Sequence, residues 1–408
     1  MKISCKLTAA IGVLLLTCTA HGAEFEVHPS VAASEEYNDN VFDTRDNRVT
    51  DYITHAMPSV TLSYKGPRMT ADINYMYDFM YYAKGSHGTD SNHTLGAFAN
   101  LNLVDGLLFL DVSDNYQRVS LDVTRDVTKE TLFVNQSDRN VGTVSPYLLF
   151  HPTQLINVKT GYRYIDTRYF DSLGVDKTDH IGFMDASYEL TPQLSATFSY
   201  NYTFEDSTSN DYNLHQASGG FRYEYADKSF LFAQGGYTWI NYETGRRLDN
   251  SFWSAGLSHN FDTSTVNLTT GIRYDEDPLA NITKEQYVNG SFDQQLDNGS
   301  VGLSLYYSEF GLPDTDILQT RKYGGVVRGN YQLSQDLSCR ASFTAEKYDN
   351  VILDTYTRMM LAEAGLSYSM GHELTIALNY TYADYYSPAI FADNKHVNRA
   401  ILQIRKAF

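Results

Sequence analysis

The chain has 408 residues, a formal net charge of −18 and 33 tyrosines. Its 14% of aromatic and 20% of charged residues exclude a disordered chain. The negative charge argues against nucleic acid as a partner, because phosphate binding needs a basic surface. Only one long apolar run is present, at the very start, which excludes a helical membrane protein.

Residues 1–22 are predicted to be a secretory signal peptide. Two lysines precede an apolar stretch over residues 7–17, which is too short to span a bilayer, and small residues follow it. Cleavage is expected after Gly22, with Ala23 as the alternative. Cys18 would suit a lipoprotein, but Thr17 stands where such sites usually carry Gly, Ala or Ser.

Cleavage leaves residues 23–408 as one predicted domain with Cys339 as its single cysteine. One cysteine cannot form an intramolecular disulfide or a cysteine-type zinc site. No phosphate-binding loop or paired metal ligands stand out, so we expect no cofactor and no metal.

The mature sequence repeats a pattern of alternating apolar and polar residues. Segments 71–81, 194–204 and 374–382 show it best. A period of two indicates β-strands with one apolar and one polar face.

The connections between these strands alternate between short and long. The nine short turns, rich in Gly, Pro, Asn and Asp, are 65–68, 104–106, 151–154, 191–193, 226–229, 262–265, 297–300, 334–336 and 371–373. The ten longer polar loops are 38–49, 84–92, 117–138, 170–179, 205–211, 243–250, 275–284, 311–322, 349–355 and 384–395.

Nineteen connections join about 20 strands, the layout of an all-β transmembrane antiparallel β-barrel with short periplasmic turns and longer extracellular loops. Eighteen strands is the alternative, because segments 93–103, 139–150 and 284–296 alternate poorly. Aromatic residues near predicted strand ends fit the interfacial girdles of such a barrel. They are Tyr64, Tyr81, Tyr225, Trp239, Phe261, Tyr274, Tyr307 and Tyr382.

The last strand resembles the C-terminal signal of outer-membrane proteins. Phe408 ends the chain, and Ala400, Leu402 and Ile404 share its parity, whereas Lys406 departs from the pattern. The resemblance implies recognition by the barrel-assembly machinery. It also implies integral placement in a Gram-negative outer membrane, with membrane lipid and lipopolysaccharide as partners.

Residues 29–42 end in Tyr37-Asn38-Asp39-Asn40-Val41-Phe42. This segment resembles the opening strand of a family of porin-like outer-membrane β-barrels associated with exosortase and exopolysaccharide systems. The resemblance implies a barrel that serves polysaccharide export, with polysaccharide as a partner. From the residues alone, the Asx-rich stretch is ordinary turn chemistry, and a cation-binding role for Asp39 is the alternative.

If the apolar face contacts lipid, parity assigns a set of charged residues to the lumen. They are Asp72, Asp78, Asp111, Lys159, Arg163, Arg222, Arg273, Arg328, Arg340, Arg399 and Arg405. Carboxylates lie toward the N-terminal wall and guanidinium groups toward the C-terminal wall, so a transverse field is predicted. The alternative is that these charges pair with one another or solvate a wet interior.

Parity places three aromatic residues, Phe98, Phe109 and Phe252, toward the lumen, where rings could stack on sugars. Acidic clusters are expected in loops, where they could hold divalent cations or stay solvated. They are Asp275-Glu276-Asp277, Glu205-Asp206, and Asp314 with Asp316.

These observations favour a passive outer-membrane channel for exopolysaccharide or other polar solutes. The alternative is a structural or surface-binding barrel whose loop 117–138 binds a polymer through Arg118, Arg125, Lys129 and Arg139. We do not expect an enzyme, because the histidines do not combine with serines and carboxylates at recognisable spacing.

Overall fold

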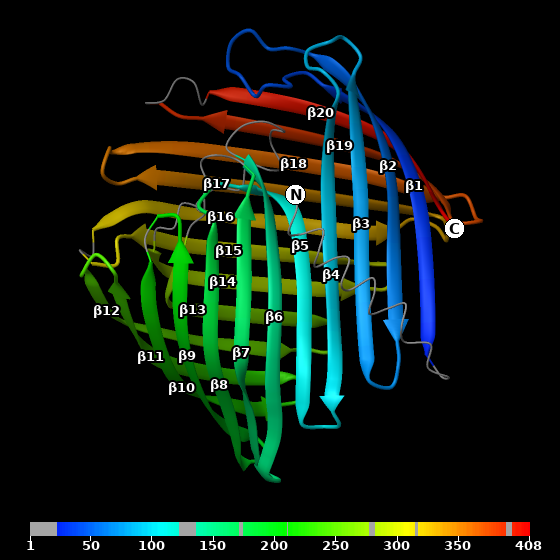
Figure 1. Cartoon of the computed structure of the whole chain (residues 1–408). Helices are drawn as coiled ribbons and strands as arrows, with labels where there is room; N and C mark the ends of the chain where they lie inside the picture. The colour runs from blue at the N-terminus through cyan, green and yellow to red at the C-terminus, as the bar shows by residue number, and fades with distance from the viewer. Residues whose placement is uncertain are drawn as a thin grey trace.

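The computed structural model describes residues 23–121, 136–170, 174–209, 211–276, 282–314, 317–388 and 394–408 (Figure 1). The predicted signal peptide lies outside this part of the chain. Twenty β-strands make up the fold, and within the described ranges no helix is long and apolar enough to cross a membrane.

The strands follow one another along the chain. They are β1 (Glu24–Asn38), β2 (Asp51–Lys65), β3 (Met69–Tyr82), β4 (Asp90–Val104), β5 (Leu108–Ser120), β6 (Gln136–Thr153), β7 (Ile156–Tyr169), β8 (Lys177–Thr191), β9 (Leu194–Ser207), β10 (Tyr212–Ala226), β11 (Ser229–Tyr242), β12 (Arg247–Asn260), β13 (Ser264–Glu276), β14 (Ile282–Leu296), β15 (Gly299–Gly311), β16 (Leu318–Gln332), β17 (Leu337–Asn350), β18 (Thr355–Ser369), β19 (Leu374–Tyr386) and β20 (Lys395–Ala407).

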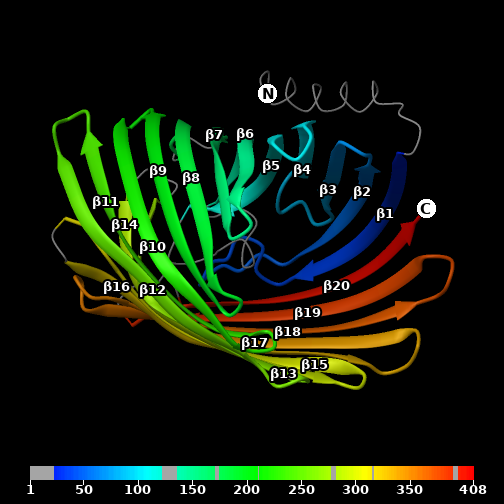
Figure 2. The same cartoon turned by 90° about the horizontal axis from the view of Figure 1, so that it is seen from below.

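Each strand pairs antiparallel with the next, and β1 also pairs with β20, so the sheet closes into a barrel (Figures 1 and 2). The closing register runs from Ser30 opposite Ala407 to Asn38 opposite Arg399. Closure removes the free sheet edges that would otherwise expose unpaired backbone groups. The predicted 20-stranded all-β barrel is confirmed.

The short connections lie where the sequence predicts them, and turn chemistry explains several. Gly106, Lys228 and Asp262 adopt positive φ values of 66°, 53° and 63°, which lets the chain reverse in two or three residues. The three weakly alternating segments form β4, β6 and β14.

Several long loops are shorter than predicted, because the strand ladders continue beyond the polar signals in the sequence. The connection predicted over 243–250 spans only 243–246, and the one predicted over 311–322 spans 312–317. The acidic residues Glu205 and Asp206 therefore lie on β9, and Asp275 and Glu276 lie on β13, not in loops.

Among the described residues, apolar clusters are small; three sit near the loop end of the barrel, and one, around Tyr64 and Met69, sits at the short β2–β3 turn. One of the three unites Val41, Ile53, Met80 and Tyr82 beneath the β1–β2 connection. Others form around Ile240 on β11 and around Leu361 on β18. The remaining apolar side chains mostly form the exposed outer face, as a bilayer-facing surface requires.

Candidate functional site

The inner face of the barrel is identified by a contact between distant strands. Lys177 at the start of β8 meets Glu276 at the end of β13, with four strands between them along the sheet. Such residues can meet only across the inside of a closed barrel, although Glu276, at the very end of β13, has the opposite parity to Arg273. Most of the large exposed apolar side chains lie on the face opposite to Lys177, which agrees with this assignment. Residues paired across neighbouring strands point to the same side of the sheet, so the strand register extends the inward assignment from Lys177 to every other strand.

All eleven charged residues predicted for the lumen lie on the same face as Lys177. They are Asp72, Asp78, Asp111, Lys159, Arg163, Arg222, Arg273, Arg328, Arg340, Arg399 and Arg405. Their surroundings differ, and the differences decide what each can do.

Among the described residues, two carboxylates on the N-terminal wall are bonded only to neutral donors. The Ser63 hydroxyl donates to Asp72 at 2.7 Å, and the Asn100 amide donates to Asp111 at 2.6 Å. Both lie close to the short-turn end of the barrel, so their negative charge acts on the lumen there.

Lys159 and Arg163 on β7 lie over aromatic rings. Lys159 Nζ is 3.9 Å from the centroid of the Tyr147 ring, and the Arg163 guanidinium is 5.0 Å from that of Phe183. Aromatic faces stabilise cations without cancelling their charge.

Three arginines along β10 to β16 have carboxylate partners. Arg222 Nε lies 3.4 Å from Glu224, and Arg328 Nη2 lies 2.7 Å from Asp293. Arg273 binds both Glu285, at 2.6 Å, and Asp275, at 2.9 Å.

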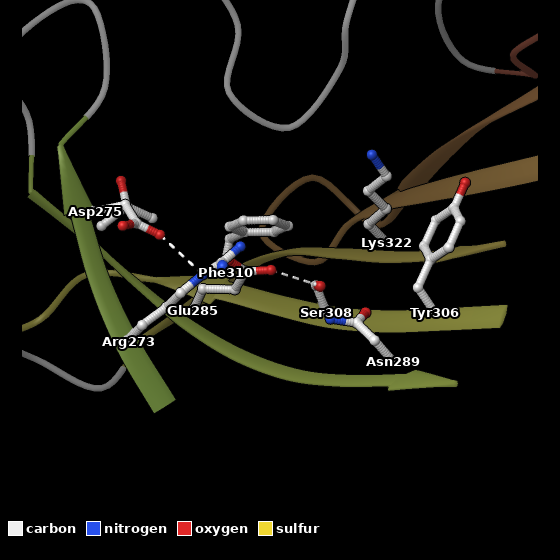
Figure 3. Close-up of a pocket in the computed structure, with 9 residues that line it drawn as sticks. Arg273, Asp275, Glu285, Asn289, Tyr306, Ser308, Phe310 and Lys322 are labelled. Atoms are coloured by element: carbon white, nitrogen blue, oxygen red, sulfur yellow. Dashed lines mark hydrogen bonds and ion pairs between the residues drawn. The ribbon is translucent and has the colours of Figure 1, made fainter. Parts of the chain in front are cut away.

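Arg273 belongs to a cavity of about 360 Å³ on the inner face (Figure 3). Tyr306 and Lys322, from β15 and β16, point into the same space as the Arg273–Glu285 pair. The cavity therefore combines both signs of charge with aromatic surface, which suits a polar solute with a ring.

Arg340 and Arg405 form a different kind of site on β17 and β20. They line a cavity of about 510 Å³ together with Asn330, Asn379 and Gln403, and no carboxylate lines it among the described residues. The Arg340 Nη2 atom donates to Asn379 Oδ1 at 2.8 Å. Two guanidinium groups beside amides present donors to an anion.

Arg399 is bound into a buried network near the loop end. It donates to both oxygens of Glu36, at 2.9 and 3.0 Å, and Glu36 is only 1% exposed. His55 lies 3.7 Å from Glu36 and 2.9 Å from Asp78. These charges satisfy one another and leave little field for the lumen.

The Asx-rich segment that carries the family resemblance fastens the first strand to the last. Asp39 accepts hydrogen bonds from the backbone and side-chain nitrogens of Asn398, both at 2.7 Å. The Asn40 amide donates to the carbonyl of Thr44 at 2.7 Å and to that of His396 at 3.2 Å. Both Asp39 oxygens are thus occupied at the seam, which gives this residue a structural role.

A second buried network joins strands that are not neighbours. Lys177 lies 3.0 Å from Glu205, which is 1% exposed, and also contacts Glu276. The Tyr212 hydroxyl donates to Glu205 at 2.8 Å. The end of β13 is thereby held against the inner side of β8–β10.

The predicted acidic clusters do not converge on an open cation site. Glu205 and Glu276 share Lys177, and Asp314 binds Arg246 at 2.5 Å. Asp277 and Asp316 lie outside the described residues. Within the described ranges, no three His, Cys, Asp or Glu side chains are grouped to hold a metal ion.

The inner face carries more aromatic residues than parity predicted. Phe98, Phe109 and Phe252 do face inward, but so do other rings. The half-buried ones include Tyr147, Phe230, Phe232, Tyr306 and Phe310, and Phe183 is buried. They were missed because aromatic residues were assigned to the lipid face.

The C-terminal residues lie on the outer face. Leu402 and Ile404 are 52% and 49% exposed and pair with β1, as does Ala400, while Phe408 is 65% exposed. Lys406 donates to the carbonyl oxygen of His372 in the β18–β19 turn and lies over the Phe408 ring. The departure from the terminal pattern therefore places a cation on backbone oxygen, not in lipid.

The loop proposed for polymer binding is described only in part. Arg118 lies on β5, where its Nε donates to Asp138 at 2.9 Å, and Arg139 lies on β6. Arg125 and Lys129 lie outside the described residues.

No family model matches the sequence, and no curated protein matches it. The FrpB iron transporter from Neisseria meningitidis (F3-3 variant) aligns with 93% of this chain and 82% of that chain, with TM-score 0.55 and 7% identity. The siderophore receptor PirA from Pseudomonas aeruginosa aligns with 94% and 80%, with TM-score 0.53 and 10% identity. Pseudomonas aeruginosa OccK7 aligns with 95% and 99%, with TM-score 0.44 and 11% identity.

The fold is that of an outer-membrane β-barrel. At these identities the similarity concerns the fold alone. It does not indicate what this chain transports.

Proposed function

We propose that the protein is an outer-membrane channel through which polar solutes pass passively. The observation that carries the proposal is the exposure of charged side chains on the inner face. The inward side chains of Arg328, Arg273 and Arg222 are 60%, 54% and 44% exposed, although each has a carboxylate partner. A filled interior would bury them, and a barrel of about this strand number is wide enough for water.

The unpaired charges supply a preference among solutes. Arg340 and Arg405 offer guanidinium groups on one wall, and Asp72 and Asp111 offer carboxylates on another. A solute with a negative group is drawn to the arginine wall, where amide side chains complete its hydrogen bonds.

The narrower form of the proposal is that the solutes are acidic oligosaccharides, in keeping with an exopolysaccharide role. Its support is the resemblance of residues 29–42 together with inward rings beside cations, such as Tyr147 beside Lys159. Sugar rings stack on aromatic faces, while their carboxylates bind guanidinium groups.

The surface-binding alternative gains no comparable support. Its described candidate Arg118 is occupied by Asp138. The channel proposal therefore stands alone as the function that the geometry favours.

Liposome swelling tests the proposal. Liposomes containing the folded barrel should swell in isotonic solutions of small sugars, and a uronic acid disaccharide should enter faster than its neutral counterpart. Swelling with no preference for the acid would retain the channel and remove the narrower form. No swelling with any solute, from barrels that show heat-modifiable gel mobility, would overturn the channel.

A further inference from the structure

The outer face carries a unit of two tyrosines and one histidine that recurs on three hairpins. In each, a Tyr-x-Tyr pair on the odd-numbered strand flanks a histidine that is the fourth residue of the following strand. The units are Tyr75, Tyr77 and His93 on β3–β4, Tyr162, Tyr164 and His180 on β7–β8, and Tyr200, Tyr202 and His215 on β9–β10.

The geometry of the three units is the same. The first tyrosine's hydroxyl hydrogen-bonds the histidine Nδ1 atom at 2.8 Å for His93, 2.6 Å for His180 and 2.8 Å for His215. The second tyrosine's ring lies beside the imidazole, with centroids 4.9, 5.3 and 4.8 Å apart in the same order. A repeat of this kind holds each imidazole in one fixed orientation.

Register places these units on the lipid side. Tyr77 and Tyr164 lie next to the inward residues Asp78 and Arg163 on their strands and therefore point the opposite way. Each histidine lies three residues in from the long-loop end of a strand of 15 residues. A span needs about 9–11 residues, so the three imidazoles lie at the extracellular boundary of the bilayer.

Because the tyrosine hydroxyl is hydrogen-bonded to Nδ1, the other imidazole nitrogen, Nε2, remains available to a partner outside the protein. When the hydroxyl donates to Nδ1, the neutral ring carries its proton on Nε2. None of the three Nε2 atoms has a hydrogen-bond partner among the described residues. A donor facing lipid without an acceptor costs free energy, and oxygen of a phosphate is a strong acceptor at that depth.

Two cationic side chains lie on the outer face near the same long-loop end of the barrel. Lys84 lies over the ring of Tyr52 at 4.9 Å, and Arg358, the fourth residue of β18, lies over Tyr386 at 4.7 Å. Both rings are about two-fifths exposed, and register places them on the outer face. Positive charge at this height favours a phosphorylated headgroup.

We propose that the three tyrosine–histidine units bind the phosphate groups of lipid A, the phosphorylated glycolipid of the outer leaflet. The long-loop side faces that leaflet, which selects lipid A over phospholipid as the source of phosphate. The proposal depends on outer-membrane placement but not on conduction, so failure of one does not imply failure of the other.

The chain supplies its own control. Tyr225 hydrogen-bonds His259 Nδ1 at 2.8 Å on the outer face, but His259 is next to the last residue of β12, at the short-turn boundary. It has the same bond in the opposite leaflet. Replacing His93, His180 and His215 by Phe keeps the rings and removes the donors, and H259F makes the same change where no lipid A is present.

The test is lipid retention by the full barrel purified in mild detergent from its own outer membrane. The variant H93F/H180F/H215F should retain lipid A at least about tenfold less than the parent, because charge-assisted hydrogen bonds are lost. H259F should retain as much as the parent, and phosphatidylglycerol should be unchanged in both. Dephosphorylated lipid A added to the delipidated parent should bind as weakly as intact lipid A binds the triple variant.

Equal retention of lipid A by parent and triple variant would overturn the proposal. So would an equal loss of phosphatidylglycerol, which would mean that the imidazoles only pack at the interface. If the triple variant does not fold, the single variants H93F and H180F, each compared with H259F, give the same decision.

Discussion

The two ends of the lumen treat charge in opposite ways. Near the loops, Glu36 and Arg399 are buried against each other, and Lys177 is held between two carboxylates. Near the short turns, Asp72 and Arg340 bond only to neutral side chains, and Arg405 has no carboxylate beside it among the described residues. Charges at the loop end thus hold strands together in buried pairs, whereas charges at the turn end, including the paired Arg222 and Arg328, keep exposed side chains that solutes can reach.

The largest expected effect comes from breaking the Glu36–Arg399 pair. R399M leaves the Glu36 carboxylate buried without its guanidinium, which should lower the free energy of unfolding by about 3–5 kcal/mol. Urea titration followed by heat-modifiable gel mobility measures it. The matched control is R405M, on the same face of the same strand, which should change stability by less than about 0.5 kcal/mol. An equal loss of unfolding free energy in both variants would contradict the distinction between the two ends.

The Lys177 contact should govern the position of the β13 end. K177M leaves Glu205 and Glu276 facing each other, so their repulsion should release the end of β13 from β8–β10. Trypsin should then cleave after Lys284 about tenfold faster, which corresponds to about 1.4 kcal/mol of local stability. The control is K322M, because Lys322 contacts Glu346 on the neighbouring strand at 3.5 Å and bridges no distant strands. Unchanged cleavage in K177M would show that the contact does not hold the end in place.

A smaller effect is expected on ion preference. A unit charge contributes about 0.4 kcal/mol at 10 Å in water, or about twofold in local ion concentration. The variant R340Q/R405Q should therefore shift the reversal potential toward cations in a potassium chloride gradient. R222Q, whose charge is already offset by Glu224, should shift it less. A larger shift from R222Q would contradict the assignment.

The last expected effect concerns the opposite wall. D72N/D111N should move the reversal potential toward anions, by no more than the arginine variant moves it toward cations, because each variant removes two unit charges and the neutral donors keep these carboxylates ionised. The same gradient experiment checks the sign. A shift toward cations would mean that these side chains do not face the conducting path.

Much of the fold follows from local sequence. Alternation in 71–81 or 194–204 can only be a half-exposed strand, and Gly106 or Pro192 marks a tight turn, so the strand count emerges from spacing. The loop limits were set too wide because Glu205 and Asp275 look like loop residues, yet they continue the ladders of β9 and β13.

The site is less accessible to sequence reasoning. Parity assigns Arg273 and Arg399 to the lumen, but it cannot show that Glu285 and Glu36 neutralise them, because their partners lie on other strands. The contact of Lys177 with Glu276 joins strands five positions apart, and nothing local encodes it. Inward rings such as Phe183 were missed because the same residue type also covers the lipid face.

The measurement that tests the central claim most directly is planar-bilayer conductance of the folded, purified barrel. A water-filled lumen predicts steady ohmic steps that are reduced when acidic oligosaccharide is added. A folded barrel that stays silent at every voltage, or conducts without any response to charged solutes, would contradict the account.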